Sequence, residues 1–346
     1  MNTFTWDAML DGFRRFGGVA ENVEQRQGPH GLGLFAIDRH RPVRIHVPES
    51  LLVPTDNIRA DGDTLTLIDP TPHPAGFGEW FALFHRHFSW GAEGRRSVAD
   101  FEEGMAALPD AVLKSLKTAG LLRLDRRHEG EWEAMALGRF LKTRSFDYQG
   151  TGVLMPVIEL INHGPDANGF VEADGIEVSG DFPAEVLVHY SVSDPIRRFF
   201  GHGFCCPEQQ AFSLPLKFQL NSRTRMRVGS HFSRATADDG EKLAGYHLPE
   251  IQRQDDVWVI DYLLLAAERT PRIPRTLLCK ALLAEPGIDA GELFDVAHSL
   301  NLRAYYAILR ACEPFHTPMV TALRSAVLTQ LEALSHHYGV RRDLLA

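Results

Sequence analysis

Two polar side chains stand at the end of an apolar run, where their chemistry could bind a heteroaromatic ligand. The run begins at Leu154, contains Glu159 and ends abruptly in Asn162 and His163. An amide and an imidazole can both donate and accept hydrogen bonds, as recognition of a heteroaromatic edge requires. The same pair could instead form a turn that satisfies its own backbone, so both interpretations stay open on this segment alone.

A single arginine lies shortly before this run, among small and aromatic residues. Arg144 follows a helical pattern and stands between Thr143 and Ser145, with Phe146 next in the chain. The guanidinium fork matches a carboxylate in shape and charge, which makes Arg144 a candidate anchor for an acid group. The plain alternative is an arginine on the surface.

Glycines near the N-terminus could bring a ligand directly against the main chain. The segment Gly31–Ala36 formally matches the dinucleotide-binding pattern G-x-G-x-x-A. That pattern needs an apolar strand before it and a helix after it, whereas Glu21–Gln27 is polar and Pro42 closes a short strand-like continuation. The context argues against a dinucleotide site. It leaves either a surface turn or glycines whose missing Cβ exposes main-chain groups to a ligand.

A tyrosine ends an alternating strand pattern further along the chain. The pattern covers Glu185–Tyr190, and a short loop with Phe199, His202 and Phe204 follows it. A tyrosine at the end of a strand is usually an amphipathic residue at the edge of the core. Tyr190 is therefore a catalytic candidate only together with the other segments.

The elements that must position these residues alternate between strands and helices. Short β-like runs over Leu32–Ile37 and Val43–Val47 precede a helical period over Phe77–Leu141. The β pattern then returns in a hairpin over Phe170–Val178, whose tight turn is Asp174-Gly175. Strands are thus expected on both sides of a helical block.

The last part of the chain has a predominantly helical pattern. It predicts helices over Val257–Ala267, Pro274–Leu283, Gly291–Cys312 and Thr317–Tyr338. The polar segment Arg234–Gln254 contains three glycine or proline breaks and is the best candidate for a linker. We therefore expect a separate, all-helical domain at the C-terminus.

Composition and charge exclude several classes of protein. The 346 residues are 44% hydrophobic and 23% charged, which is typical of a soluble globular chain with two or three cores. The formal net charge of −9 argues against a nucleic-acid surface, although the strip Arg223, Arg225 and Arg227 could contact an acidic partner. No signal-peptide core and no stretch of about 18 apolar residues is present, so no membrane association is expected.

Cysteines and histidines show no metal-binding spacing. Cys205 and Cys206 are adjacent, and the other two cysteines lie far downstream, which favours a reducing cytoplasm and no metal site. His85 and His87 would point about 200° apart on a helix. The adjacent pair His336-His337 is expected at a solvated helix end. Neither G-x-S-x-G nor H-E-x-x-H occurs in the chain.

The order of these motifs resembles the SET domain of the RuBisCO large-subunit methyltransferase group. The most specific parts of the resemblance are Thr143–Phe146 and Pro156–His163. It implies an α+β fold, in which a SET-domain β-fold of short strands is interrupted by a helical insertion and followed by an all-helical domain. The implied segments are an N-terminal SET part over 1–50, a mainly helical insertion over 51–147, a C-terminal SET part over 148–234, a linker over 235–254 and a helical substrate-binding-like domain over 255–346.

The resemblance also implies a cofactor, S-adenosyl-L-methionine, and the residues that bind it. Leu32 and the flanking Gly31 and Gly33 would bind its methionine end through main-chain groups. Arg144 would hold the carboxylate of the cofactor. The pair Asn162 and His163 would seat its adenosine part.

Further residues take their implied roles from the same resemblance. Tyr190 corresponds to the catalytic tyrosine beside the reacting methyl group. Glu159 stands where the family usually has aspartate and would line the channel for the target side chain. Ser145, His202 and Phe204 are the other expected substrate-binding residues, and no metal is expected.

Three departures from the family pattern bear on the target residue. Tyr190 is followed by Ser191 instead of glycine, and Pro183-Ala184-Glu185 replaces the usual Gly-Glu-Glu. His202 stands where lysine methyltransferases of this group commonly have tyrosine. A relative that methylates histidine also lacks that tyrosine, so the resemblance favours lysine and leaves histidine open.

The sequence therefore predicts an S-adenosylmethionine-dependent protein N-methyltransferase. Its protein substrate is expected to dock on the C-terminal helical domain and in the SET cleft. The alternatives are a SET-like module that binds cofactor or peptide with little or no catalysis, and a dinucleotide-dependent oxidoreductase. The identity of the substrate, the number of methyl groups transferred and the oligomeric state stay open.

Overall fold

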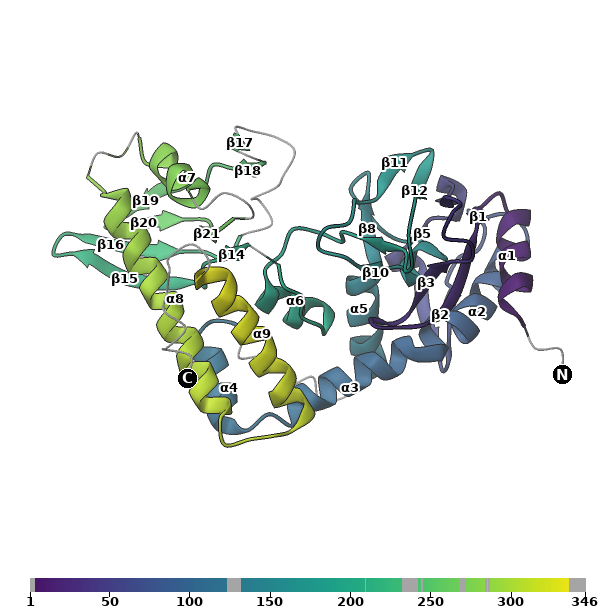
Figure 1. The fold of residues 1–346 in the computed structure, drawn as a ribbon, viewed down its shortest axis with the longest axis horizontal. Coiled ribbons are helices and arrows are strands. Elements are labelled where there is room, and N and C mark those ends of the chain that lie inside the picture. The colour runs from purple at the N-terminus through teal and green to yellow at the C-terminus, as the bar shows by residue number, and fades with distance from the viewer. Residues whose placement is uncertain are drawn as a thin grey trace. The chain divides into compact units, whose positions relative to one another are not determined.

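The computed structural model shows an α+β protein of two compact units. It describes residues 4–122, 132–208, 210–231, 242–243, 245–267, 272–283, 285 and 287–335. Unit 1 comprises the described residues of Met1–Glu103 and Arg127–Ser191, and unit 2 comprises those of Gly104–Arg126 and Val192–Ala346. The α+β class predicted from the sequence is thereby confirmed (Figure 1).

Unit 1 contains most of the strands (Figure 1). Its elements are α1 (Trp6–Arg15), β1 (Val19–Glu21), β2 (Val23–Gly28), β3 (Gly31–Ala36), β4 (Val43–Val47), η1 (Glu49–Leu51), β5 (Val53–Pro54), η2 (Thr55–Asn57), β6 (Ile58–Asp61), β7 (Thr64–Leu67), α2 (Phe77–Phe88), η3 (Trp90–Gly94), the first part of α3 (Arg95–Ala106), α5 (Trp132–Arg144), β8 (Ser145–Tyr148), β9 (Thr151–Leu154), η4 (Ile158–Leu160), β10 (Asn162–His163), β11 (Val171–Ala173), β12 (Gly175–Gly180) and β13 (Leu187–Val188).

The strands of unit 1 form several small sheets. One sheet has the order β1-β4-β12-β11 and a second has the order β5-β9-β8, both with antiparallel neighbours. Two separate hairpins are β2-β3 and β6-β7, and the pair β10-β13 is parallel. The predicted runs over Leu32–Ile37 and Val43–Val47 and the hairpin at Asp174-Gly175 are confirmed by β3, β4 and the pair β11-β12.

An aromatic stripe on α2 closes the core of unit 1. Phe77, Trp80, Phe81 and Phe84 recur at helical spacing and are buried, with Trp80 and Phe84 stacked at 5.5 Å between ring centroids. Residues three or four apart lie on one face of a helix, so this face can pack while the opposite face meets solvent. The stripe anchors α2, whose next inward-facing residue is the buried His85.

Unit 2 combines a sheet with long helices. Its elements are the end of α3, α4 (Asp110–Thr118), α6 (Pro195–His202), β14 (Ala211–Phe212), β15 (Leu216–Asn221), β16 (Thr224–Val228), β17 (Lys242–Leu243), β18 (Tyr246–His247), β19 (Ile251–Gln254), β20 (Val257–Ile260), β21 (Leu264–Ala266), α7 (Ile273–Ala281), α8 (Ala290–Cys312) and α9 (Pro318–Ser335). Its main sheet has the order β15-β16-β20-β19, in which β16 and β20 run parallel. Helices α8 and α9 pack side by side (Figure 1).

The predicted helix over Val257–Ala267 is wrong, because this segment forms β20 and β21. A short apolar run cannot be assigned to helix or strand from periodicity alone. The β-branched residues Val257, Val259 and Ile260 favour a strand, and Asp261 breaks the run. The C-terminal region is therefore not all-helical.

The predicted linker and insertion also differ from the structure. The described residues of 235–254 include strands β17, β18 and β19, and β19 belongs to the main sheet of unit 2. The segment 51–147 begins with strands β5 to β7, and its helix α4 packs on α8 within unit 2. Patterns along the chain do not reveal which core a helix joins.

The later helices agree with the sequence. Helices α7 and α8 lie where Pro274–Leu283 and Gly291–Cys312 predict them, and α9 covers most of Thr317–Tyr338. The pair His336-His337 lies outside the described residues. Within the described ranges, no helix is both long enough and apolar enough to span a membrane.

Candidate functional site

Three segments that are distant in sequence meet in unit 1. The Val186 N–H donates to the carbonyl of Leu34 at 2.8 Å, so the segment before β13 lies beside β3. Strand β13 also pairs with β10, which places Asn162 opposite Leu187 and His163 opposite Val188. The predicted glycines, the Asn-His pair and the strand that leads to the tyrosine are thereby gathered into one region.

Asn162 joins two of these segments through its side-chain amide. Its Nδ2 donates to Glu185 Oε1 at 2.8 Å and to the carbonyl of Leu32 at 3.4 Å. A Cβ at Gly33 would lie 2.5 Å from Asn162 Nδ2 and 2.7 Å from Glu185 Oε1, closer than real Cβ atoms come. Gly33 is therefore required by the close approach of these side chains. Gly31, at the turn of the β2-β3 hairpin, is required by its φ of 94°.

The β2-β3 hairpin also decides between two interpretations of the glycine motif. Residues Gly28 and Gly31 face each other across a two-residue turn, and β3 continues as a strand after Gly33. A dinucleotide fingerprint needs a helix at that point. The segment therefore lacks the helix that this fingerprint requires.

His163 and Tyr190 hold each other in place. The Tyr190 N–H donates to His163 Nδ1 at 3.2 Å, so the ring proton of a neutral His163 resides on Nε2. The Tyr190 hydroxyl lies 2.5 Å from the carbonyl oxygen of Ile161. A carbonyl can only accept, so the hydroxyl must donate, and the lone pairs of its oxygen point elsewhere. Tyr190 can thus accept a hydrogen bond while its orientation is fixed.

A strained backbone precedes the Asn-His pair. Val157 has φ 72° and ψ −54°, close to the rare γ-turn geometry, although its side chain is β-branched and fully buried. Such a conformation persists only where the surrounding structure imposes it, and it concentrates at functional sites. Here it turns the chain from β9 into η4 and so sets where Glu159 and Asn162 lie.

Arg144 is held at the end of α5, directly against η4. Its Nη1 donates to the main-chain oxygen of Glu159 at 2.7 Å, and its guanidinium lies 4.9 Å from the ring centre of Phe140. A guanidinium has five N–H donors, so this bond leaves donors that could bind a carboxylate. The geometry is compatible with the predicted anchor.

Glu159 lies in the interior of unit 1 and forms a buried polar cluster with Ser89 and His85. Its Oε1 accepts a hydrogen bond from the Ser89 hydroxyl and lies 3.7 Å from His85 Nδ1. The side chains of Glu159 and His85 are both fully buried. A side chain that lines a channel for the target residue would be exposed to that channel. In this conformation the Glu159 carboxylate is buried instead.

Burial moves both titrating groups of the cluster toward their neutral forms. It raises the pKa of Glu159 to about 7, although the Arg144 charge and the Ser89 hydroxyl oppose the shift. It holds the pKa of His85 well below its usual value, and Arg144 acts in the same direction. At neutral pH the cluster therefore carries less charge than its residue types imply.

The remaining predicted residues are distributed over both units. Ser145 opens β8 in unit 1 and pairs with Leu154. His202 and Phe204 belong to unit 2, where their ring centroids lie 5.9 Å apart across Gly203, the C-cap of α6 with φ 86°. His85 is buried and His87 is exposed, so the two side chains lie in different environments on α2.

Sequence patterns did not indicate that Glu185, His85 and Ser89 belong to this region. Glu185 binds the Asn162 amide, and the other two belong to the Glu159 cluster. For Glu185 a signal existed, since it is a charged residue directly before an apolar strand. For His85 the signal was its place on the aromatic face of α2.

Comparisons with known proteins identify similar folds at low sequence identity. No protein-family model and no curated protein matches the chain. The solved structure of the SET domain of LSMT bound to lysine and AdoHcy is 13% identical, with a TM-score of 0.40 over 98% of this chain and 91% of that chain. Rubisco LSMT bound to sinefungin and monomethyllysine is also 13% identical, with a TM-score of 0.46 over 96% and 90%. Rubisco LSMT bound to AdoMet is 13% identical, with a TM-score of 0.40 over 95% and 88%.

Proposed function

We propose that the protein is an S-adenosylmethionine-dependent protein N-methyltransferase of the SET-domain class, with lysine as the favoured target. The observation that carries the proposal is the meeting of Gly33, Asn162 and Tyr190 in unit 1. These residues come from three distant segments, and the order of those segments is the one that resembles the SET domain. Their contacts supply a main-chain edge, an amide and an oriented hydroxyl in one region.

The residues present fit the proposed cofactor. Gly33 has no room for a Cβ, so main-chain groups rather than a side chain border the Asn162 amide there. Arg144 would hold the cofactor carboxylate, and Asn162 with His163 would hold the adenosine part. When bound, S-adenosylmethionine supplies an electrophilic methyl group on a positively charged sulfonium.

The chain itself would orient a neutral nucleophile. The Tyr190 hydroxyl donates a hydrogen bond to the Ile161 carbonyl, so its oxygen can accept a hydrogen bond from an N–H of the target amine. A lysine with a usual pKa of about 10.4 must first lose a proton, and a desolvated position beside a positive charge lowers that pKa. Tyr190 acts here by alignment, which can contribute several kcal/mol to rate acceleration.

Histidine is the second candidate target. The observation that favours it is His202, which occupies the position where the resembled lysine methyltransferases have tyrosine. An imidazole with a usual pKa of about 6.5 is already neutral at pH 7 and needs no deprotonation. Mass spectrometry of a methylated substrate would distinguish the two targets by the modified residue.

The proposed partner is a protein substrate, and the proposed compartment is the cytoplasm. The four cysteines of the chain form no disulfide, as expected in a reducing compartment. Docking on the helices of unit 2 and in the SET cleft stays part of the proposal.

The decisive experiment is isothermal titration with S-adenosylmethionine. We expect micromolar binding to the wild type and a loss of at least about tenfold in Arg144→Ala and Asn162→Ala, since each removes a group that holds one part of the cofactor. Arg39→Ala, an exposed arginine on a turn of unit 1, is the control and should bind as the wild type does. Wild-type protein that binds no cofactor contradicts the proposal. Binding without transfer of a tritiated methyl group to any lysate protein would favour the binding module.

A further inference from the structure

One face of the main sheet in unit 2 carries cations around an apolar strip. Successive side chains of a strand point to opposite faces. The register places Lys217 opposite Arg227, which lies opposite Val259, while Arg225 lies opposite Val257. These five side chains therefore share one face, which we name the cationic face.

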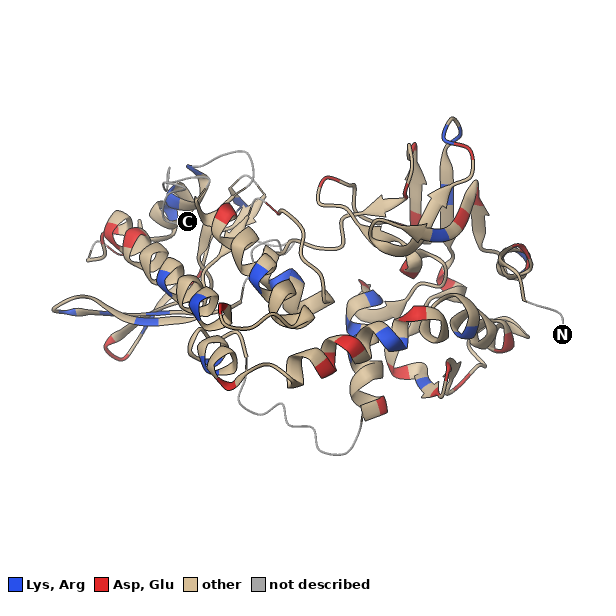
Figure 2. Cartoon of the chain, turned by 60° about the horizontal axis from the view of Figure 1, so that its bottom comes forward, with Lys and Arg blue, Asp and Glu red and all other residues tan. Residues whose placement is uncertain are grey.

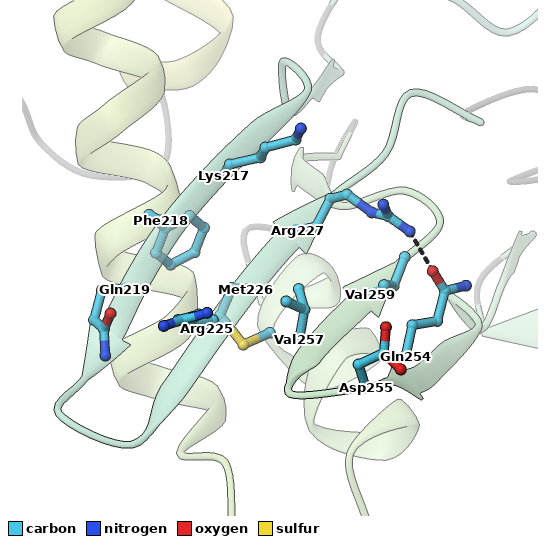
Figure 3. Close-up of a pocket in the computed structure, with 10 residues that line it drawn as sticks. All are labelled: Lys217, Phe218, Gln219, Arg225, Met226, Arg227, Gln254, Asp255, Val257 and Val259. Atoms are coloured by element: carbon cyan, nitrogen blue, oxygen red, sulfur yellow. Dashed lines mark hydrogen bonds between the residues drawn. The ribbon is translucent and has the colours of Figure 1, made fainter.

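The cationic face is hollowed. A depression of about 400 Å³ lies on it, lined by the five residues of this face together with Phe218, Gln219, Met226, Gln254 and Asp255 (Figure 3). The two valines belong to the central strand β20, and the long polar side chains come mainly from β15 and β16. An apolar floor with cations beside it fits a ligand with both hydrocarbon and negative groups.

The cations of this face are weakly compensated. Arg227 donates to the neutral amide oxygen of Gln254, and Lys217 makes no ion pair with the described residues. Arg225 pairs with Asp256 at 2.8 Å, but both side chains are more than half exposed, so water screens the pair. The face is thus a local positive region on a chain of net charge −9, and basic positions follow the β15-β16 hairpin in Figure 2.

We propose that the cationic face binds an extended acidic segment of the protein substrate. The proposal rests on the proposed function, because it names the part of the substrate that the chain would recognise away from the methylated residue. In an extended peptide, every second side chain points the same way at a spacing of about 7 Å. Arg225 and Arg227 have this same spacing along β16, so carboxylates at alternate positions match them.

A nucleic acid fits the face less well than an acidic peptide. The cations number three, whereas affinity for nucleic acids grows with each phosphate neutralised. One aromatic residue, Phe218, lines the depression, whereas single strands are bound by stacking on successive aromatic rings. An oligonucleotide is therefore an outcome of the test.

The test is fluorescence anisotropy with a labelled peptide that alternates glutamate and serine. We expect binding to the wild type that weakens as salt rises, and a loss of about tenfold or more in Lys217→Glu/Arg227→Glu. Lys217→Gln/Arg227→Gln should lose less, because it removes attraction without adding repulsion. The matched control is Arg253→Glu/Arg303→Glu, which changes the net charge equally, with Arg253 on the opposite face of β19 and Arg303 exposed on α8.

Each result either supports or overturns the proposal. Equal losses in the charge-reversal variant and its control would show an effect of net charge alone and overturn it, as would no binding to the wild type or tighter binding of an oligonucleotide. Cofactor titration of the same variants separates this proposal from the proposed function. Unchanged S-adenosylmethionine binding with lost peptide binding supports both, whereas a wild type that binds peptide but no cofactor overturns only the function.

Discussion

The interior of unit 1 and the cationic face of unit 2 treat charged side chains in opposite ways. In unit 1, Glu159 and His85 are fully buried, and burial shifts both toward neutrality. In unit 2, Arg225 and Asp256 pair in solvent, each with more than half of its side chain exposed. Removing a group from water makes its interactions strong and specific, while solvent screens an exposed pair. Substitutions should therefore have large and local effects in unit 1 and small, salt-dependent effects on the sheet of unit 2.

The largest effect is expected for Tyr190→Phe. The variant removes the hydroxyl that the Ile161 carbonyl holds, so the target amine loses its acceptor. We expect methyl transfer to fall about 100-fold, the size of effect that misplacement of a reacting group can cause. The affinity for the cofactor should stay within about threefold, because the variant removes only an uncharged hydroxyl group. Transfer rates and cofactor titration measure the two quantities separately.

The control for this variant is Tyr148→Phe, which removes a hydroxyl from a buried tyrosine on β8. It should keep its methyl transfer rate. Full activity in Tyr190→Phe would contradict the role of Tyr190, and equal losses in both variants would indicate a general loss of packing in unit 1.

Gly33→Ala should have the next largest effect, because the side chains around Gly33 leave no space for a Cβ atom. The new Cβ would lie 2.5 Å from Asn162 Nδ2, so the amide must shift away from Glu185. Overpacking of this kind costs about 2 kcal/mol, or about 30-fold in cofactor affinity if all of it falls on binding. Isothermal titration measures that loss. Gly138→Ala is the control, since its Cβ would meet open space on α5.

An unchanged affinity in Gly33→Ala would weaken the contrast between the two regions. It would mean that the side chains around Gly33 can move as readily as those on an open surface. A loss of affinity in Gly138→Ala as well would point to a change in unit 1 as a whole, since alanine at an exposed helical position should slightly stabilise the protein.

Glu159→Gln tests the buried cluster through pH. The folded-state pKa of Glu159, about 7, lies above its usual 4.5, so between these values the folded protein binds more protons than the unfolded chain. This term lowers the stability of the wild type as pH rises through that window. Glutamine keeps an oxygen to accept from Ser89 and cannot ionise, so the variant should gain stability relative to the wild type up to about pH 7 and then level off.

Urea unfolding at a series of pH values measures this difference. The groups that face Glu159 are His85 from α2, the Ser89 hydroxyl and Arg144 from α5. A wild type that becomes more stable than the variant as pH rises would show that the attraction of Arg144 outweighs burial. Glu133→Gln, an exposed glutamate on α5, should show no such trend.

The smallest effect is expected for Arg225→Ala. The exposed pair with Asp256 contributes at most about 1 kcal/mol, so the free energy of unfolding should change by less than this amount and the change should vanish at high salt. Thermal or urea unfolding at two salt concentrations provides the measurement. A loss of several kcal/mol would show that this face is structurally as demanding as the interior of unit 1.

Much of the fold could be predicted because it follows from local patterns. Strands β3 and β4, the hairpin β11-β12 and helices α7 to α9 lie where alternation, turn residues and helical spacing predicted them. The segment Val257–Ala267 was assigned to a helix because a short apolar run has no decisive period. Its β-branched residues become a strand where β16 and β19 offer hydrogen-bonding partners on both sides.

The candidate site could be predicted only in part. The sequence identified Asn162, His163 and Tyr190. In the structure the Tyr190 N–H bonds to His163, and the Asn162 amide bonds to Glu185. The sequence did not identify Glu185 as the partner of Asn162, because no spacing relates two residues from different strands. The sequence also did not reveal that Glu159 is buried, since the apolar run that contains it is equally typical of the rim and of the interior of a core.

The sequence by itself determined the types of the chemical groups, their order along the chain and the local turns that carry them. Gly31 can adopt its positive φ wherever the hairpin lies in the fold. The aromatic stripe on α2 predicts a buried helix face without any knowledge of the elements that cover it. The tertiary structure alone decided which groups meet, which side chains lose water and hence which pKa values shift. Burial and contact depend on residues far apart in the chain, and a pattern along one segment holds no information about what covers it.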